Sequence, residues 1–178
     1  SWISDAVPKL TNNLSHSDPG EKSTRVGSEW NRKNPFPARL SLNKLMSKNG
    51  SGKEIRHYEV DISDSGIEYS AGDVINVLPV NNSTLVSLII ERLDIDPSYI
   101  PNGKEQSLEV LLNLKPLQHR AYSISSSPKK YPDSVHMTIS SVRWLTNNRD
   151  HLGVCSTYLA DRVNDDQKVK IFMSPNKA

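Results

Sequence analysis

The sequence has little of what marks disulfide-rich, thiolate-metal or membrane-spanning proteins. It holds one cysteine, Cys155, so it can form neither an internal disulfide nor a thiolate metal cluster. Its longest apolar run, LVSLII at 85–90, is far too short to cross a bilayer. No charged-then-apolar signal segment opens the chain. We therefore expect a reduced, cytoplasmic protein with no membrane partner.

Charge of one sign is also lacking. The 178 residues include 22 basic and 20 acidic side chains, for a net charge of +2. Such a balance creates no strong field toward nucleic acid or an anionic membrane. The histidines show no ligand spacing, so we expect no metal site; they are His16, His57, His119, His136 and His151.

The first 34 residues differ from the rest. They are rich in Ser, Asn and Pro and lack sustained periodicity, which favours a linker or extended arm, with Trp2 and Trp30 as possible anchors. We expect the folded domain to span residues 35–178.

Within that domain, short segments with strand alternation are separated by turn residues. We expect strands over 34–45, 55–62, 74–80, 120–123, 134–144 and 168–173. A helix is expected over 84–94 with Ser83 as its N-cap, and a glycine turn should lead into a second helix within 151–163. Residues 106–117 are ambiguous and could form a short helix. Short connections favour antiparallel pairing, as in a barrel or sandwich.

The segment HRAYSISSSP, residues 119–128, places a guanidinium, an aromatic ring and a hydroxyl on one short strand. A dinucleotide flavin needs a cation or clustered N–H groups for its pyrophosphate, and an aromatic partner for its ring. Arg120, Tyr122 and Ser123 could supply these groups, and Gly153 with Ser156 could form a phosphate-facing helix start. Taken alone, Tyr122 is more simply a core or hairpin tyrosine, and Gly-X-X-Ser is an ordinary cap. The order of the elements favours the flavin.

These segments together resemble a known family. Residues 34–176 are similar to the FAD-binding domain of the diflavin reductases, and most of all to the flavoprotein component of NADPH-dependent sulfite reductase. The similar segments are NPFPARLSLNKL, KEIRHYEVDISDSGIEYSAGDVINVLPVN, RAYSISSSP, VHMTISSVRW, GVCSTYLADRV and VKIFMSPN. The resemblance implies a mainly β (α+β) fold: a flattened antiparallel Greek-key barrel of the ferredoxin–NADP reductase type, with a few short helices.

The resemblance also implies site residues. In it Arg120 faces the FAD pyrophosphate, Tyr122 stacks on the isoalloxazine, and Ser123 hydrogen-bonds near N5 as the catalytic residue. Trp144 lies near the adenine, and Cys155 is a neighbour of the cofactor and not a nucleophile; a buried small apolar role for Cys155 stays open. The full cofactor-binding set implied is Arg120, Ala121, Tyr122, Ser123, Thr138, Ile139, Ser140, Trp144, Gly153, Val154, Cys155 and Ser156, in which 153–156 wrap the phosphates through backbone amides and a hydroxyl.

Three departures from the family pattern stand out. The helical connecting insert is largely absent, because only residues 94–118 separate the helix after VLPVN from Arg120. No pyridine-nucleotide motif follows residue 173, and no FMN domain precedes residue 1, so the NADPH-binding and FMN domains are expected outside this chain.

The implied function is that of an FAD-binding module in an NADPH-dependent reductase. Electrons would pass from NADPH through FAD to FMN and then to a haemoprotein, with a siroheme sulfite-reducing subunit favoured. The isolated chain is not expected to turn over NADPH. Two alternatives stay open within flavin chemistry: a stand-alone, non-enzymatic electron-transfer module and the FAD domain of a cytochrome reductase-type diflavin enzyme. A small barrel that binds nucleic acid or protein is disfavoured, because basic and aromatic residues are not interleaved on one face.

Overall fold

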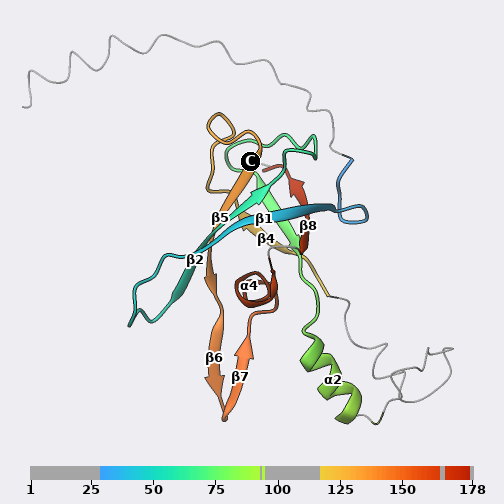
Figure 1. The fold of residues 1–178 in the computed structure, drawn as a ribbon, viewed down its shortest axis with the longest axis vertical. Coiled ribbons are helices and arrows are strands. Elements are labelled where there is room, and N and C mark those ends of the chain that lie inside the picture. The colour runs from blue at the N-terminus through green and yellow to red at the C-terminus, as the bar shows by residue number, and fades with distance from the viewer. Residues whose placement is uncertain (1–28, 93, 95–116, 165–166, 177–178) are drawn as a thin grey trace, which may run out of the picture.

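The computed structural model describes residues 29–92, 94, 117–164 and 167–176 (Figure 1). The regular structure of the described chain is mainly strand, with few and short helices. Its strands are β1 (Phe36–Leu45), β2 (Glu54–Asp61), β3 (Val74–Leu78), β4 (Arg120–Ser123), β5 (Ser134–Ser141), β6 (Arg143–Thr146), β7 (Arg149–Leu152) and β8 (Lys168–Ser174). Its helical elements are α2 (Ser83–Arg92), α4 (Val154–Thr157) and the π-helical turn η1 (Tyr158–Arg162) that continues α4.

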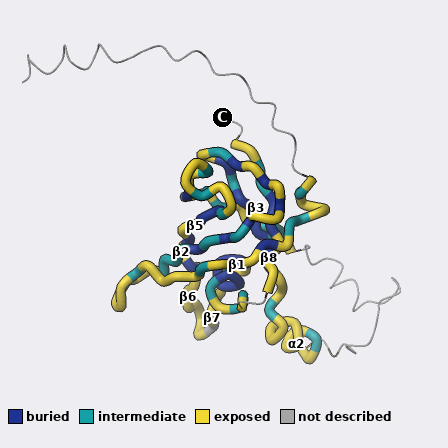
Figure 2. Tube along the Cα trace, turned by 45° about the horizontal axis from the view of Figure 1, so that its top comes forward, coloured by how far each residue is buried: buried dark blue, intermediate teal, exposed yellow. Residues whose placement is uncertain are grey.

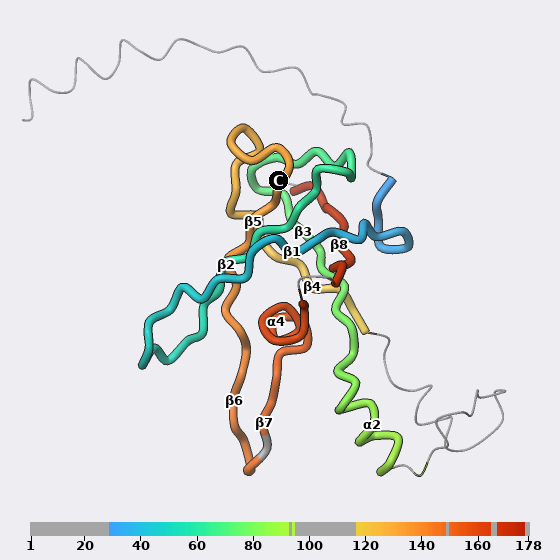
Figure 3. The backbone as a smooth tube through the Cα atoms, in the orientation of Figure 1, coloured from blue at the N-terminus to red at the C-terminus, as the bar shows by residue number. Residues whose placement is uncertain are grey.

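Six of these strands form one antiparallel sheet in the order β4-β3-β8-β1-β2-β5 (Figure 3). The last strand of the chain, β8, therefore lies between β1 and β3. The two edge strands, β4 and β5, approach each other at one point. There the N–H of Ser125, just after β4, donates to the carbonyl of His136 in β5 at 2.9 Å. The expected mainly β, antiparallel class of the ferredoxin–NADP reductase type is confirmed.

The core lies on one face of this curved sheet (Figure 2). Alternate residues point inward, as the period of two in a strand requires. The apolar side chains that are fully removed from solvent come from β2, β3, β5, β8 and the α4–η1 segment, and include Tyr58, Val60, Ile75, Val77, Val135, Met137, Leu159, Val169 and Ile171. Sheet and helix thus share one core.

The strand expected over 134–144 is broken in two. β5 ends at Ser141, and after Val142 the chain enters a separate hairpin, β6–β7, that leaves the main sheet. Asn147 and Asn148 form its turn with φ of 52° and 57°, the two positive values that a two-residue type I′ turn requires. The sequence prediction missed β7 because residues 151–152 were assigned to the glycine turn. The Asn147-Asn148 pair was the signal that could have predicted a hairpin turn here.

The helix expected over 84–94 is present as α2, but Ser83 is not its cap. Instead the Asn82 side chain accepts from the Leu85 N–H at 3.3 Å, and the Asn82 carbonyl accepts from the Val86 N–H at 2.9 Å. The prediction was therefore wrong by one residue, because both Asn82 and Ser83 are good capping types. No residue of α2 is buried.

The chain before β1 is anchored as expected at Trp30. Its indole N–H donates to the Ser65 carbonyl at 2.7 Å, and its ring lies 5.1 Å from that of Phe36. The predictions for Trp2 and for 106–116 fall outside the described residues. None of the described helices is long and apolar enough to span a membrane.

Candidate functional site

The first part of the site is β4, at the edge of the main sheet. β4 pairs with β3, which places Tyr122 opposite Ile75 and Ser123 opposite Val74. Tyr122 is half-buried against the core, whereas Arg120, Ala121 and Ser123 are exposed. The Arg120 guanidinium donates to the carbonyls of Gln118 and His119, at 3.4 and 3.2 Å. Charge, ring and hydroxyl therefore lie on one edge strand, as the sequence predicts.

The second part is the turn that leads into α4. The Gly153 N–H donates to the Val142 carbonyl at 2.8 Å, and the Gly153 carbonyl accepts from the Thr157 N–H and hydroxyl. A Cβ at Gly153 would lie 2.6 Å from the Ser156 Oγ and 2.7 Å from the Val142 Cβ. Glycine is needed here for close approach of the hairpin to the helix, since its φ of −64° suits any residue.

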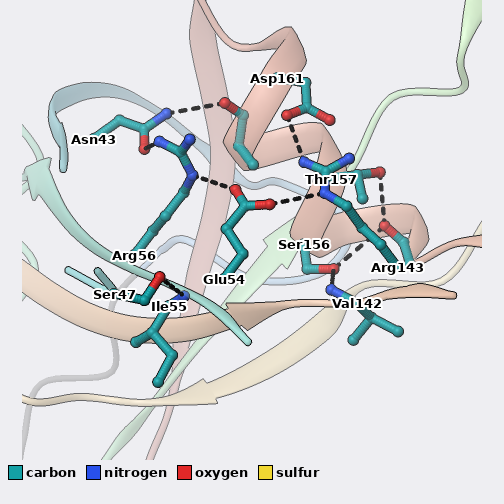
Figure 4. Close-up of polar contacts among 12 residues, drawn as sticks. Asn43, Ser47, Glu54, Ile55, Arg56, Val142, Arg143, Ser156, Thr157 and Asp161 are labelled. Atoms are coloured by element: carbon teal, nitrogen blue, oxygen red, sulfur yellow. Dashed lines mark hydrogen bonds and ion pairs between the residues drawn. The ribbon is translucent and has the colours of Figure 1, made fainter. Parts of the chain in front are cut away.

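Ser156 is buried, and its hydroxyl is used within the protein (Figure 4). Its Oγ accepts from the Val142 N–H at 3.1 Å and lies 3.4 Å from the Gly153 carbonyl, to which it donates. The hydroxyl thus joins the hairpin base to the helix start. The groups left for an anion are the first backbone N–H groups of α4, which have no acceptor within the helix.

β4 and α4 meet at Tyr122 and Cys155. Burial raises the pKa of the Tyr122 hydroxyl, and its hydrogen bond with the Cys155 thiol raises it further. Burial also raises the pKa of Cys155, partly offset by Tyr122 and by the positive charges of Arg120 and Arg162. Cys155 is 1% exposed, so its thiol stays neutral and inaccessible. It is a packing neighbour of the site and lacks the character of a nucleophile.

The third part is the end of β5. Ile139 is buried, and Thr138 and Ser140 are exposed on the opposite face of the strand. α4 and β4 both contact β5. Ile139 lies in the same core cluster as Cys155, and Tyr122 packs against that cluster. The described structure thus brings together Tyr122, Ile139 and Cys155 from three segments that lie apart in the sequence. Thr138 and Ser140 are on the other face of β5, where the Thr138 Oγ1 lies 3.5 Å from the His57 Nδ1.

Trp144 lies apart from this group, on the β6–β7 hairpin that projects from the sheet (Figure 1). It is 52% exposed, and one ring face stacks on His151 with centroids 4.9 Å apart and planes 7° from parallel. The hairpin therefore presents an aromatic surface near the Gly153 turn.

The sequence prediction missed a polar network that joins the hairpin to the sheet and to η1 (Figure 4). Arg143 donates to Glu54 at 2.8 Å and to Asp161 at 2.6 Å. Glu54 also accepts from Arg56 at 2.6 Å, so bonds from both guanidiniums lower its pKa to about 2. No local signal could reveal these partners, because Glu54 and Arg143 are 89 residues apart.

A second arginine ties η1 to its surroundings. Arg162 donates to the Val80 carbonyl at 2.8 Å and to the Val154 carbonyl at 3.2 Å. Beside it is an open hollow of about 490 Å³, lined by the segment after β3, by η1 and by the start of β8, with Arg162 and Lys168 as its cations. This feature was not anticipated from the sequence either.

The chemistry of these groups suits a dinucleotide flavin. A permanent cation and the start of a helix can hold a pyrophosphate, a half-buried tyrosine can face a conjugated ring, and the glycine turn admits close backbone approach. No acidic side chain in the described part of the chain forms an ion pair with Arg120. The residues therefore fit the FAD that the sequence predicts.

Comparison with known proteins agrees with this geometry. A family model described as the FAD binding domain matches residues 28–102 and 104–158. The match divides at residue 103, between α2 and β4, where the family's connecting insert is expected.

Curated relatives share the name sulfite reductase [NADPH] flavoprotein alpha-component. The protein of Mannheimia succiniciproducens is 29% identical over 83% of this chain and 36% of its own length. Those of Neisseria meningitidis serogroup C and Bacillus subtilis are 26% and 24% identical, each over 89% of this chain.

The chain spans less than two fifths of the length of these relatives. The Mannheimia alignment extends over 212 positions, although only 83% of 178 residues take part, so the relative holds residues that this chain lacks. Both the order of the elements and the family match lead to one conclusion: this chain belongs to the FAD-binding domain family of flavoprotein oxidoreductases.

Proposed function

We propose that this chain is the FAD-binding module of an NADPH-dependent reductase of the sulfite reductase type. The observation that carries the proposal is the convergence of Arg120, Tyr122 and the start of α4 around Cys155. Sequence-distant segments that supply a cation, a ring and helix N–H groups at one place suit a ligand with both a pyrophosphate and a conjugated ring.

In this proposal Arg120 and the N–H groups of Val154, Cys155 and Ser156 hold the pyrophosphate. Within the described residues, the Arg120 guanidinium donates to the carbonyls of Gln118 and His119. A phosphate would replace these with charge-assisted hydrogen bonds. Ser156 acts by fixing the turn, since its hydroxyl is already bonded to Val142 and Gly153.

The remaining residues are proposed to contact the rest of the cofactor. Tyr122 faces the isoalloxazine, with Ser123 beside the reacting N5 edge, and the strand around Ile139 lines the ring. Trp144 offers its exposed ring to the adenine, because more than half of its surface is open to solvent. Bound FAD would accept a hydride and release single electrons.

The finer parts of the proposal concern the whole reductase. NADPH is the proposed donor, FMN the next carrier, and a haemoprotein, in the sulfite reductase type a siroheme subunit, the final acceptor. The names of the relatives support NADPH and the sulfite reductase type, whereas FMN and the haemoprotein rest on the family resemblance of the sequence. This chain covers 36–38% of those relatives. Residues 35–178 are the proposed FAD domain and 1–34 its linker to the FMN domain. The single buried cysteine suits a cytoplasmic location.

Flavin titration tests the proposal directly. The flavin-free chain should bind FAD more tightly than FMN, because FMN lacks the pyrophosphate assigned to Arg120 and α4. Arg120→Ala should weaken FAD binding by about 1.5–3 kcal/mol and leave FMN binding nearly unchanged. Lys129→Ala, which removes an exposed cation outside the site, is the matched control. Equal affinities for FMN and FAD would reject the assignment.

A further inference from the structure

The outer face of the β2–β5 pair carries a cluster that the flavin site does not use. His57 and Glu59 are two residues apart on β2, so both point away from the core that Tyr58 and Val60 enter. On the paired strand His136 lies opposite Glu59, and Thr138 lies opposite His57. Two imidazoles and one carboxylate are therefore held on adjacent strands by the sheet register.

The three side chains converge. One ligand atom from each of His57, Glu59 and His136 lies within 4.8 Å of the other two. The His57 Nε2 is 3.5 Å from the Glu59 Oε1, and the two imidazole rings meet edge to face with centroids 5.3 Å apart. Ligand atoms around tetrahedral zinc are about 3.3 Å apart, given bonds of about 2.0–2.1 Å, so small side-chain rotations would suffice.

The surroundings of the two imidazoles also favour a cation. The Ser134 Oγ lies 3.1 Å from the His136 Nε2, and the Thr138 Oγ1 lies 3.5 Å from the His57 Nδ1. Such hydroxyls orient imidazole ligands from outside the coordination shell.

We propose that His57, Glu59 and His136 bind one divalent cation of the zinc class. Two histidines, one carboxylate and a solvent molecule make a four-coordinate zinc site with one exchangeable position. Magnesium and calcium are disfavoured because they prefer all-oxygen ligands. The bound ion would join β2 to β5, the strand that also carries Ile139 of the proposed flavin site.

The test is zinc binding by the untagged, full-length chain, measured as competition with a chromophoric chelator. We expect one zinc per chain, both with and without flavin. His57→Gln, Glu59→Gln and His136→Gln should each weaken zinc affinity by at least 100-fold, since loss of an outer-shell partner alone costs about 10–100-fold. His151→Gln, which removes an imidazole from the separate hairpin, should change the affinity less than about twofold.

A second measurement, the melting temperature with and without zinc, keeps the proposal testable if one variant fails to fold. Zinc should raise the melting temperature of the wild type and of His151→Gln, but not that of His57→Gln, whose side chain is partly exposed and outside the core. Cobalt(II) added to the flavin-free wild type should give the visible bands of a four-coordinate site. Absence of stoichiometric binding at about 100 μM zinc, or wild-type affinity in the His57 and Glu59 variants, would overturn the proposal. His57, Glu59 and His136 would then be a hydrogen-bonded cluster that binds no metal. Both outcomes are independent of FAD affinity.

Discussion

The two helical segments, α2 and α4–η1, have similar lengths and opposite environments. α2 has no buried residue, and Leu85, Leu88 and Ile89 are exposed along it. The α4–η1 segment is buried from Cys155 to Leu159, and Tyr158 and Leu159 lie inside the core of the sheet. Figure 2 shows the contrast as an exposed α2 extending away from the buried sheet.

The difference lies in the connections and not in the helical pattern. α4–η1 is joined to the rest of the domain by the Gly153 turn, by Ser156, by the bond from Arg143 to Asp161 and by the bond from Arg162 to the Val80 carbonyl. In the described chain, α2 is fixed chiefly at its start, by Asn82. Apolar residues at helical spacing thus predict a helix but leave open what, if anything, the helix covers. The following predictions test this contrast, in order of decreasing effect.

Truncation of a buried leucine should show the largest difference between the two segments. Leu159→Ala should lower the free energy of unfolding by about 2–5 kcal/mol, because Leu159 is fully buried and its loss leaves a cavity. Leu88→Ala on α2 should change it by less than about 0.5 kcal/mol. Urea unfolding of both variants measures this. Equal losses would mean that α2 is packed in solution.

The Gly153 turn should be the next most sensitive feature. Gly153→Ala places a methyl group against the Ser156 hydroxyl and Val142, which should cost about 1–3 kcal/mol of stability and reduce FAD affinity. Gly52→Ala is the matched control, because a Cβ added there would have nothing within 4 Å and the backbone needs no positive φ. The melting temperature measures the loss of stability, and flavin titration measures the loss of FAD affinity. If Gly153→Ala has wild-type stability and FAD affinity, the hairpin does not approach the helix too closely for a Cβ at residue 153.

The bonds of Glu54 should make a smaller, pH-dependent contribution. A carboxyl group whose pKa falls from 4.5 to about 2 on folding stabilises the protein above pH 4.5, and this stability is lost as the pH falls toward 2. We expect Glu54→Gln to cost about 1–2 kcal/mol at pH 6, after allowance for partial exposure. The difference from wild type should narrow steadily between pH 4.5 and 2. Denaturant unfolding across that range would show a constant difference if the network contributes nothing.

Loss of the α2 cap should have the smallest global effect. Asn82→Ala removes the side-chain bond to the Leu85 N–H, which stabilises a helix start by about 1 kcal/mol. Because α2 shares little with the core, amide exchange within 83–92 should accelerate while the unfolding midpoint of the domain hardly changes. Thr157→Ala is the comparison on the buried segment, since it removes the bond from the Thr157 hydroxyl to the Gly153 carbonyl. In Thr157→Ala the unfolding midpoint of the whole domain should fall.

The sequence predicted the features that depend on local pattern. The alternation of Phe36, Ala38 and Leu40 marked β1, and the Arg-X-Tyr-Ser segment marked β4 as the strand of the site. It also placed the start of the buried helix after Gly153. Each of these follows from residues a few positions apart, whose side-chain period and turn chemistry specify one local structure.

What it could not predict depends on distant contacts. The Arg143 bonds to Glu54 and Asp161, the internal use of the Ser156 hydroxyl, and the meeting of His57 with His136 all follow from strand order and register. Spacing along the chain concealed the histidine pair, because paired strands bring together residues 79 positions apart. The β5–β6 break at Val142 did leave a local signal, because the apolar alternation changes there from the odd positions 135, 137 and 139 to the even positions 142 and 144.

The central place of β8 has a consequence for how this domain is made. β8 is the last strand of the sheet to leave the ribosome, yet β1 and β3 both pair with it. Until residues 168–174 have emerged, the sheet is two incomplete pieces, β4-β3 and β1-β2-β5, each with an unpaired edge. Such long-range closure is slow and leaves strand edges open to wrong partners. Folding of this domain should therefore wait until β8 has been synthesised, and chains that stop before β8 should be substrates for chaperones and proteases.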